Sequence, residues 1–473
     1  MEKGTDMYDV VIVGAGISGI NFAYRLQERN LELTYTILEG RHEMYLGLRS
    51  DTSLYTFGFS WRPWKETTSI AEGHLITKYL NQSAQENGID QHIQCNRQVN
   101  AARWSSEHKM WSLDVTGNGA EKTYRCRFMI LCTGYYDYNE ALDASIPGIK
   151  TFRGPVVHPQ FWPEDLDYSK KDVVIIGSGA TAVTFLPALA EQASHVTMLQ
   201  RSPGYILSIP PQDGVEKFIW RWFRPAMQDG LLWLKWLLLP FIFVNMFYYL
   251  PSFARNFMRK QTMAQLGDEM ALDPHFTPKY EVGEQRLCFC PDSDFYKALR
   301  SGKASIETDV IESTDIGREL HPYIIITATG LKLQIAGSIE LTVDGKPYDL
   351  PSKYVWKGAM LQDLPNCAFV IGYADAAWTL GADATAQLIT RILRQMRREG
   401  VVEVRPHMTK ADKKTMQEKP LLRLSSTYIT KGGQVLPRAG DRGQWAVRSY
   451  YLKDILIAWF GDIKSSMVWV KGA

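Results

Sequence analysis

The sequence predicts an α/β protein with two Rossmann-like dinucleotide-binding domains. Its 473 residues exceed what a single hydrophobic core usually holds, which favours two or three domains. Two glycine-rich loops indicate the class, because each follows a short apolar run and precedes residues with helical spacing. The loop positions are Gly14, Gly16 and Gly19 in the first unit and Gly177, Gly179 and Ala182 in the second.

The first loop follows the apolar run Val10–Val13 in DVVIVGAGISG. Gly14 permits the tight turn, Gly16 lets the backbone approach a pyrophosphate, and Gly19 lets the helix pack on the strand. A second strand, TYTILE, ends in Glu39, whose carboxylate can accept hydrogen bonds from ribose hydroxyls. We therefore interpret this unit as a dinucleotide site rather than a glycine-rich turn without a ligand.

The second loop, in IIGSGATAV, has the GxGxxA form, and its second strand ends differently. HVTMLQ is followed by Arg201 and Ser202 instead of an acid. An arginine at this point can pair with a 2′-phosphate, whereas an acid would repel it, so this unit favours NADP over NAD. The alternative is a solvated surface arginine. Opposite charges at the two ribose positions predict two different dinucleotides in one chain.

A further signal occurs in both halves, where a β-rich run ends in a Thr-Gly pair. FMILCTGYY contains Thr133 and Gly134, and YIIITATG contains Thr329 and Gly330. We expect each pair to close its nucleotide-binding unit with a late strand and a turn that glycine permits.

The connection between the two units carries the pattern FxGxxxHxxxWP, at Phe152, Gly154, His158, Trp162 and Pro163. This pattern, between two glycine loops, resembles the fingerprint of the Baeyer-Villiger monooxygenases, class B flavoprotein monooxygenases that depend on FAD and NADPH. The resemblance extends over nearly the whole chain and includes LCTGYYDY, HPQFWPEDLDY, IGSGATAVT, MLQRSP, QRLCFCPDSDFYKAL and LPNCAFVIGYADAAWTLGADATAQL.

The resemblance implies an FAD domain built from both ends of the chain, with an inserted NADP domain. We expect the FAD domain at 1–148 and 336–473, and the NADP domain at 149–335 with an apolar helical insert at about 215–265. The implied reaction uses O2 and a C4a-peroxyflavin to convert a small lipophilic ketone to an ester or lactone. Alternatives are oxygenation of sulfur or nitrogen, and a catalytically silent nucleotide-binding relative.

By the same resemblance, Arg286 stabilises the peroxyflavin and touches the nicotinamide, and Asp51 pairs with it. A carboxylate beside a guanidinium stays ionised and orients it, so this pair is chemically sensible; a structural ion pair is the alternative. Trp378 is expected near the flavin, in the C-terminal part of the FAD domain; a core tryptophan is the alternative. His158 and Trp162 are expected to hold the linker that orients the two domains, a structural role that we favour over catalysis.

Two departures from the family pattern concern the loops. The chain runs almost directly from Glu39 to Arg49, without the GGTW-type segment that packs against FAD in the family. IESTDIGRELHPYIIITATG is likewise short of a hairpin arm. The first departure is what keeps the catalytically silent alternative open.

Net charge and cysteine content limit the kinds of partner, metal site and cellular compartment that we expect for this chain. The formal charge is +2, with nearly balanced basic and acidic residues, so we expect no nucleic-acid partner. The six cysteines are scattered, which predicts neither a metal site nor a disulfide framework and fits a reducing compartment such as the cytoplasm. The N-terminus lacks the features of a signal peptide.

Residues 231–250, LLWLKWLLLPFIFVNMFYYL, are apolar apart from one lysine and one asparagine. About 20 such residues can span a bilayer. A single crossing would place Gly177 and Arg286 on opposite sides, although both are expected to serve one NADPH site. We therefore favour a helical pair broken at Pro240, partly buried, which makes peripheral contact with a membrane.

Overall fold

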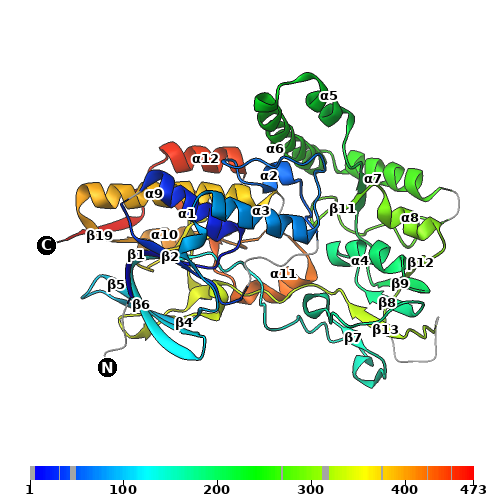
Figure 1. Cartoon of the computed structure of the whole chain (residues 1–473), viewed down its shortest axis with the longest axis horizontal. Helices are drawn as coiled ribbons and strands as arrows, with labels where there is room; N and C mark the ends of the chain where they lie inside the picture. The colour runs from blue at the N-terminus through cyan, green and yellow to red at the C-terminus, as the bar shows by residue number, and fades with distance from the viewer. Residues whose placement is uncertain are drawn as a thin grey trace.

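Two sheets, each with helices packed on it, organise the molecule (Figure 1). The computed structural model describes residues 6–30, 32–42, 49–267, 270–311, 319–373, 376–422, 424–448 and 450–472. Its helices are α1 (Ile17–Arg29), α2 (Leu54–Phe57), α3 (Gly73–Glu86), α4 (Ala180–Ala190), α5 (Gly214–Trp222), α6 (Pro225–Tyr249), α7 (Pro251–Leu266), α8 (Asp294–Arg300), α9 (Trp378–Glu399), α10 (Lys410–Thr415), α11 (Thr427–Gly432) and α12 (Tyr451–Phe460).

The first sheet combines strands from both ends of the chain. They are β1 (Asp6–Val13), β2 (Tyr35–Leu38), β3 (Ile93–Gln94), β4 (Gln98–Ser105), β5 (Met110–Gly117), β6 (Ala120–Leu131), β14 (Glu340–Val343), β15 (Lys346–Pro347), β16 (Val355–Trp356), β17 (Met360–Leu361) and β18 (Cys367–Phe369). The order is β15-β14-β4-β5-β6-β1-β2-β3, with β18 also beside β6. β1 is parallel to β2 and β6, as a Rossmann-like unit requires.

The second sheet lies between the two parts of the first in sequence. Its strands are β7 (Val156–Val157), β8 (Asp172–Ile176), β9 (His195–Gln200), β12 (Ala304–Thr308) and β13 (Ile324–Thr327). All pair in parallel, in the order β12-β9-β8-β13-β7. The prediction of an α/β fold with two Rossmann-like units is therefore confirmed. We propose 149–335 as the inserted domain, since these five strands lie within it and the first sheet resumes at β14.

Short strand pairs complete the described structure. They are β10 (Ile206–Ile209) with β11 (Cys288–Pro291), β19 (Val401–Pro406) with β22 (Met467–Lys471), and β20 (Glu418–Lys419) with β21 (Ala439–Gly440).

Strand alternation divides the first sheet between two cores. Val10 and Ile12 of β1 pack with α1, α3 and α9, while Val11 and Val13 face the other side, toward β4, β5 and β18. α9 comes from the C-terminal part of the chain, and its Asp383 is paired with Arg25 of α1, Oδ1 to Nε, at 2.7 Å. Both side chains are buried, so losing either would leave a buried charge unpaired.

The apolar segment differs from the expected pair broken at Pro240. α6 continues through Pro240 to Tyr249, and the chain turns at Leu250 before Pro251 begins α7. Proline inside a helix costs about 3 kcal/mol, but α6 buries Leu232 and Leu237 in the first core and Phe247 in a cluster beside α7. The burial of these three side chains, at separate points of α6, offsets the cost. Pro251, in contrast, occupies a first helical position, which suits proline.

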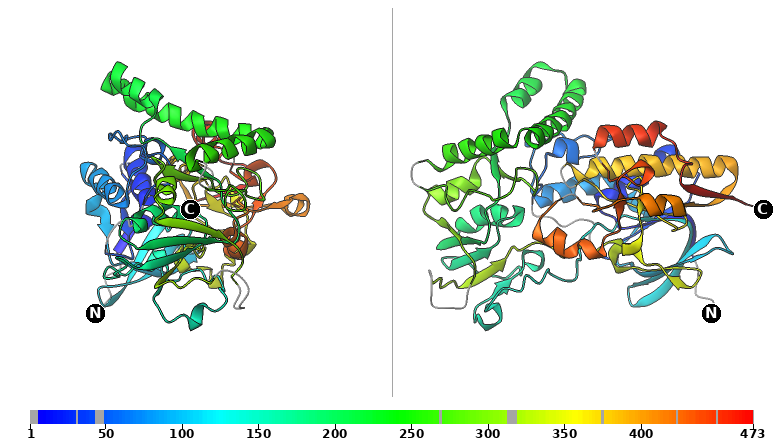
Figure 2. Two further views of the ribbon diagram at one scale, coloured as in Figure 1. Left: turned by 90° about the vertical axis from the view of Figure 1, so that its right-hand side faces the viewer. Right: turned by 180° about the vertical axis from the view of Figure 1, so that it is seen from behind.

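α6 is, within the described residues, the one helix long and apolar enough to cross a membrane by length and composition. Figures 1 and 2 show it above both sheets, with α5 beyond it and α12 beside it. It therefore lies across the side of the molecule where the two domains meet.

Candidate functional site

The first glycine loop turns between β1 and α1 in the geometry that its sequence predicts. Gly14 has φ +104°, and a Cβ there would overlap the carbonyl oxygen of Cys132. A Cβ on Gly19 would overlap the Gly14 carbonyl, whereas one on Gly16 would meet nothing within 4 Å. Open space at the N-terminus of α1, where backbone N–H groups point outward, fits a pyrophosphate.

Glu39 follows β2 and reaches back to this loop. Its Oε2 accepts a hydrogen bond from the Ala15 backbone N–H at 2.8 Å, and its Oε1 accepts one from the Arg41 backbone N–H at 3.0 Å. The carboxylate therefore lies at the loop itself, where an acceptor for ribose hydroxyls is needed.

The second loop repeats the geometry of the first. Gly177 has φ +133°, a Cβ there would overlap the Ala328 carbonyl, and a Cβ on Gly179 would meet nothing within 4 Å. Ala182 is fully buried against the sheet. The open position again lies where a helix begins, so the second loop also fits a pyrophosphate.

Arg201 and Ser202 follow β9 beside this loop. The Ser202 carbonyl accepts a hydrogen bond from the Ser178 hydroxyl at 2.7 Å, which ties the segment to the loop. The exposed Arg201 guanidinium donates from Nη2 to Thr427 Oγ1 at 3.4 Å. An exposed guanidinium next to the loop is free to turn toward a 2′-phosphate.

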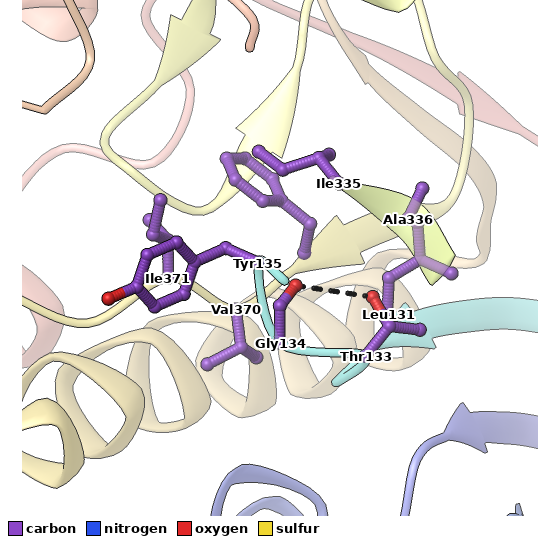
Figure 3. Close-up of a pocket in the computed structure, with 9 residues that line it drawn as sticks. Leu131, Thr133, Gly134, Tyr135, Ile335, Ala336, Val370 and Ile371 are labelled. Carbon is purple, nitrogen blue, oxygen red and sulfur yellow. Dashed lines mark hydrogen bonds between the residues drawn. The ribbon is translucent and has the colours of Figure 1, made fainter. Parts of the chain in front are cut away.

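The two Thr-Gly pairs lie next to the two glycine loops. Gly14 faces Cys132, directly before Thr133, and Gly177 faces Ala328, directly before Thr329. A small pocket at the first of these turns is lined by Thr133, Gly134 and Tyr135 and by residues after β18 and before β14 (Figure 3). It lies beyond the carboxyl end of β6, the edge at which open α/β sheets bind ligands.

Asp51 and Arg286 come together across the two domains, with Oδ2 and Nη2 2.6 Å apart. Burial lowers the pKa of Arg286, but the Asp51 carboxylate and the nearby Tyr135, Tyr136 and Tyr428 outweigh this effect and raise it above its ordinary value. The Arg286 side chain as a whole remains 30% exposed. The result is a permanently charged group that Asp51 orients.

Tyr135 and Trp378 extend this group toward the first glycine loop. Their rings stack with centroids 4.9 Å apart and planes 8° apart. The indole N–H of Trp378 donates to the Ser18 hydroxyl, in the first turn of α1, at 2.9 Å. Trp378 is therefore both packed in the core and bonded beside the loop.

Burial raises the pKa of Tyr135 to about 12, and its hydroxyl lies 2.6 Å from that of Tyr136. Both phenols are therefore neutral at physiological pH and can donate hydrogen bonds. Sequence reasoning did not select Tyr135 or Tyr428. Tyr135 follows the Thr133–Gly134 pair directly, so it could have been found from that turn, but the position of Tyr428 depends on a contact far along the chain.

The linker fingerprint is part of the second sheet and its surroundings, since β7 pairs with β13. His158 donates from Nε2 to the Gly330 carbonyl at 3.2 Å and accepts at Nδ1 from the Gln160 backbone N–H at 3.3 Å. Burial lowers the pKa of His158, while its bond to Gly330 opposes the shift. A neutral imidazole satisfies both bonds, which fits a structural link to the second Thr-Gly turn.

The other fingerprint residues also make packing contacts. Trp162 packs on Phe185 of α4 with ring centroids 5.3 Å apart. A Cβ on Gly154 would overlap the Tyr323 carbonyl and the ring of Phe152. Pro163 follows Trp162, and its carbonyl accepts from the Leu166 N–H at 3.3 Å. The fingerprint thus connects β13, the second loop helix and the interdomain segment.

The two shortened loops and the expected lack of a metal site remain to be compared with the structure. The positions at which the GGTW-type segment would occur, 43–48, lie outside the described residues, as do residues 312–318 of the shortened stretch 311–330. In the ranges that the structure covers, no cluster of three or more histidine, cysteine or acidic side chains could hold a metal ion.

Comparison with known proteins gives consistent matches. The flavin-binding monooxygenase-like family matches residues 9–218. The FAD-containing monooxygenase EthA of Mycobacterium tuberculosis is 40% identical over 97% of this chain and 96% of its own length. The probable FAD-binding monooxygenase AlmA of Acinetobacter baylyi is 38% identical over 96% and 93%. A solved steroid monooxygenase with bound NADP has the same fold, with a TM-score of 0.75 at 18% identity over 98% of this chain and 100% of its own.

Proposed function

Because the chain belongs to the class B flavoprotein monooxygenases, we propose that it catalyses Baeyer-Villiger oxygenation of a ketone to an ester or lactone. As a member of this family it is an NADPH-dependent flavin monooxygenase that uses FAD and O2 on a small substrate. The Asp51–Arg286 pair, which joins the two domains beside Tyr135 and Trp378, is the main support for the Baeyer-Villiger reaction.

We assign FAD to the first loop and NADPH to the second. Gly16 and Gly179 leave space for a pyrophosphate, Glu39 suits the ribose of FAD, and Arg201 suits the 2′-phosphate of NADPH. Bound flavin, once reduced by NADPH, supplies the oxygen-activating chemistry. Trp378 and Ser18 then lie where they can limit movement of the flavin-side loop.

Arg286 supplies positive charge at the junction of the domains. A cation held in a fixed direction stabilises negative charge that develops during oxygen transfer, and a preformed site needs no reorganisation at that moment. Asp51 orients the guanidinium, and the neutral hydroxyls of Tyr135 and Tyr136 add hydrogen-bond donors nearby. The partly buried setting reduces the water that competes for the same charge.

The direct test is Arg286→Ala in the flavin-loaded protein. We expect the flavin spectrum to persist and ester formation from a ketone to fall at least 100-fold, as when a main electrostatic stabiliser is removed. Before this comparison, anaerobic NADPH should bleach the bound flavin of the unmodified protein. A variant that forms ester at the full rate would refute the role of Arg286.

The reaction type needs its own comparison. A ketone and a thioether should be offered across a pH series, because a nucleophilic oxygen donor favours the ketone and an electrophilic one favours the thioether. We expect ester to dominate at high pH. Sulfoxide as the main product at every pH would replace the Baeyer-Villiger assignment by sulfur oxygenation.

We further propose that the substrate is lipophilic and that residues 231–250 make peripheral contact with a membrane. α6 supports this proposal, because it is apolar and large parts of it are exposed. A carbonyl compound that partitions into a bilayer would then be concentrated next to the enzyme.

A further inference from the structure

The helices α5, α6 and α12 lie along the top of the molecule in Figure 1 and in the right-hand view of Figure 2. Each of them carries exposed aromatic side chains. We call this surface the apolar face and represent it by Phe218, Trp222, Phe241, Tyr249, Trp459 and Phe460. The ring of Phe241 on α6 lies 5.3 Å from that of Tyr450, which precedes α12. Segments more than 200 residues apart thus form one surface, larger than the stretch 231–250.

The outward side of α6 is uninterrupted by charge. Leu234, Phe241, Val244 and Tyr248 are exposed at spacings of seven, three and four residues, which places them on one stripe. Lys235 points the other way and pairs with Asp213 and with Glu216, whose side chain is 1% exposed. The charge of Lys235, which interrupts the apolar sequence, is therefore balanced by carboxylates of the protein and does not lie on the outward side of α6.

Charge around the apolar face is strongly biased. Residues 214–266 contain seven lysines and arginines and two acids, a formal charge of +5 in a chain whose total is +2. Two of the seven are paired with acids: Lys235 with Asp213 and Glu216, and Arg255 of α7 with Glu281. Of the acids, Glu216 is buried and Asp229 is paired with Lys65. On α5, the exposed Lys217 and Arg221 alternate with exposed Phe218 and Trp222. Basic and aromatic side chains mixed on one helix suit the surface of an anionic bilayer.

The packing of α6 sets its direction relative to that bilayer. Leu232 and Leu237 are buried in the first core and Phe247 in the cluster beside α7, so the helix is held along its length. Crossing a membrane would pull these side chains from both domains. Lying in the plane of the interface retains them and still buries the outward stripe.

We propose that α5, α6 and α12 form a docking face for an anionic lipid bilayer, on which the helices lie parallel to the membrane. This extends the peripheral contact proposed above and rests on it, although it does not depend on the reaction. α6 also packs on α2, which begins three residues after Asp51. A docked enzyme would therefore hold its proposed site close to lipid-dissolved substrate.

The test is flotation of the full-length, flavin-loaded protein with vesicles of phosphatidylcholine alone or with 30% phosphatidylglycerol. We expect flotation with the anionic vesicles and little with the neutral ones. Lys217→Gln with Arg221→Gln should weaken binding roughly 30-fold, from two basic side chains near a charged surface. Trp222→Asp with Tyr249→Asp and Phe460→Asp should weaken it roughly 100-fold, since three aromatic contacts are lost.

Val310→Asp is the matched control, because Val310 is exposed and lies outside the apolar face. It should bind vesicles as the unmodified protein does. All variants should be assayed on a water-soluble ketone, so that loss of docking with retained turnover separates this proposal from the proposed function. Equal binding to neutral vesicles, unchanged binding of the aspartate variant, or a dimer that the aspartate variant dissociates would each overturn the proposal.

Discussion

Asp51→Asn tests whether the interdomain ion pair orients Arg286 for chemistry. The substitution keeps the shape of the side chain and removes the charge that lies 2.6 Å from Nη2. A hydrogen bond to a charged group contributes about 1.5–3 kcal/mol, and a surface ion pair about 0–1 kcal/mol. Because Asp51 is 43% and Arg286 30% exposed, we place the loss between these values, at about 1–2 kcal/mol.

A loss of this size corresponds to roughly a 5- to 30-fold slower oxygenation step. We expect this decrease in the rate of ester formation, together with more hydrogen peroxide released per NADPH consumed, measured by product and peroxide analysis on the same reactions. The affinity for FAD should not change. Asp51→Glu should recover most of the rate, because the charge returns with a longer side chain.

Asp294→Asn is the matched control for Asp51→Asn. It breaks another interdomain ion pair, in which Asp294 Oδ2 lies 2.8 Å from Arg49 Nη1. If both variants lose the same activity and coupling, the Asp51–Arg286 pair only docks the domains, and the positioning argument fails. It fails equally if Asp51→Asn oxygenates and couples as the unmodified enzyme does.

Three further substitutions test other parts of the site. Gly16→Ala should leave thermal stability unchanged, since the added Cβ meets open space, but should weaken FAD binding at least roughly tenfold. Gly14→Ala should instead lower the melting temperature, because φ at this position is +104°. Equal effects of the two variants in calorimetry and in FAD titration would contradict this expectation. Arg201→Ala should raise KM for NADPH roughly 5- to 30-fold and leave that for NADH unchanged, and an equal change for both would refute 2′-phosphate contact. Burial lowers the pKa of His158, so the unfolded chain binds more protons than the folded one, and the free energy of unfolding should fall as the pH drops below about 6.5. His158→Gln should reduce this loss of stability, measured by urea titration at several pH values. An unchanged loss would exclude His158 as its source.

Local patterns were sufficient to predict both nucleotide-binding units. A GxGxxG or GxGxxA run after a strand determines a turn and the start of a helix within about ten residues, and Gly14 and Gly177 have the positive φ that this turn needs. The α/β fold followed, since strands alternating with helices pair in parallel. The roles of Arg286 and Asp51 came from family resemblance, because nothing in their local sequence brings residues 235 positions apart together.

Features that depend on tertiary contacts could not be read from the sequence. The stacking of Tyr135 on Trp378 joins residues from distant parts of the chain. Pro240 predicted a break, but burial of α6 against two separate clusters retained one helix through it. The direction of Lys235 likewise depends on Asp213 and Glu216 lying beneath it, so only the structure shows that the outer side of α6 is free of charge.

Two ion pairs of opposite polarity, both made by the short segment 49–51, hold the two domains in their relative orientation. The Arg49 guanidinium pairs with the Asp294 carboxylate of the inserted unit. Two residues later, the Asp51 carboxylate pairs with the Arg286 guanidinium of the same unit. A shift that brought Arg49 near Arg286 and Asp51 near Asp294 would place like charges together. The two pairs therefore favour one relative orientation of the domains. The segment that completes the proposed site is therefore also one that aligns the two domains.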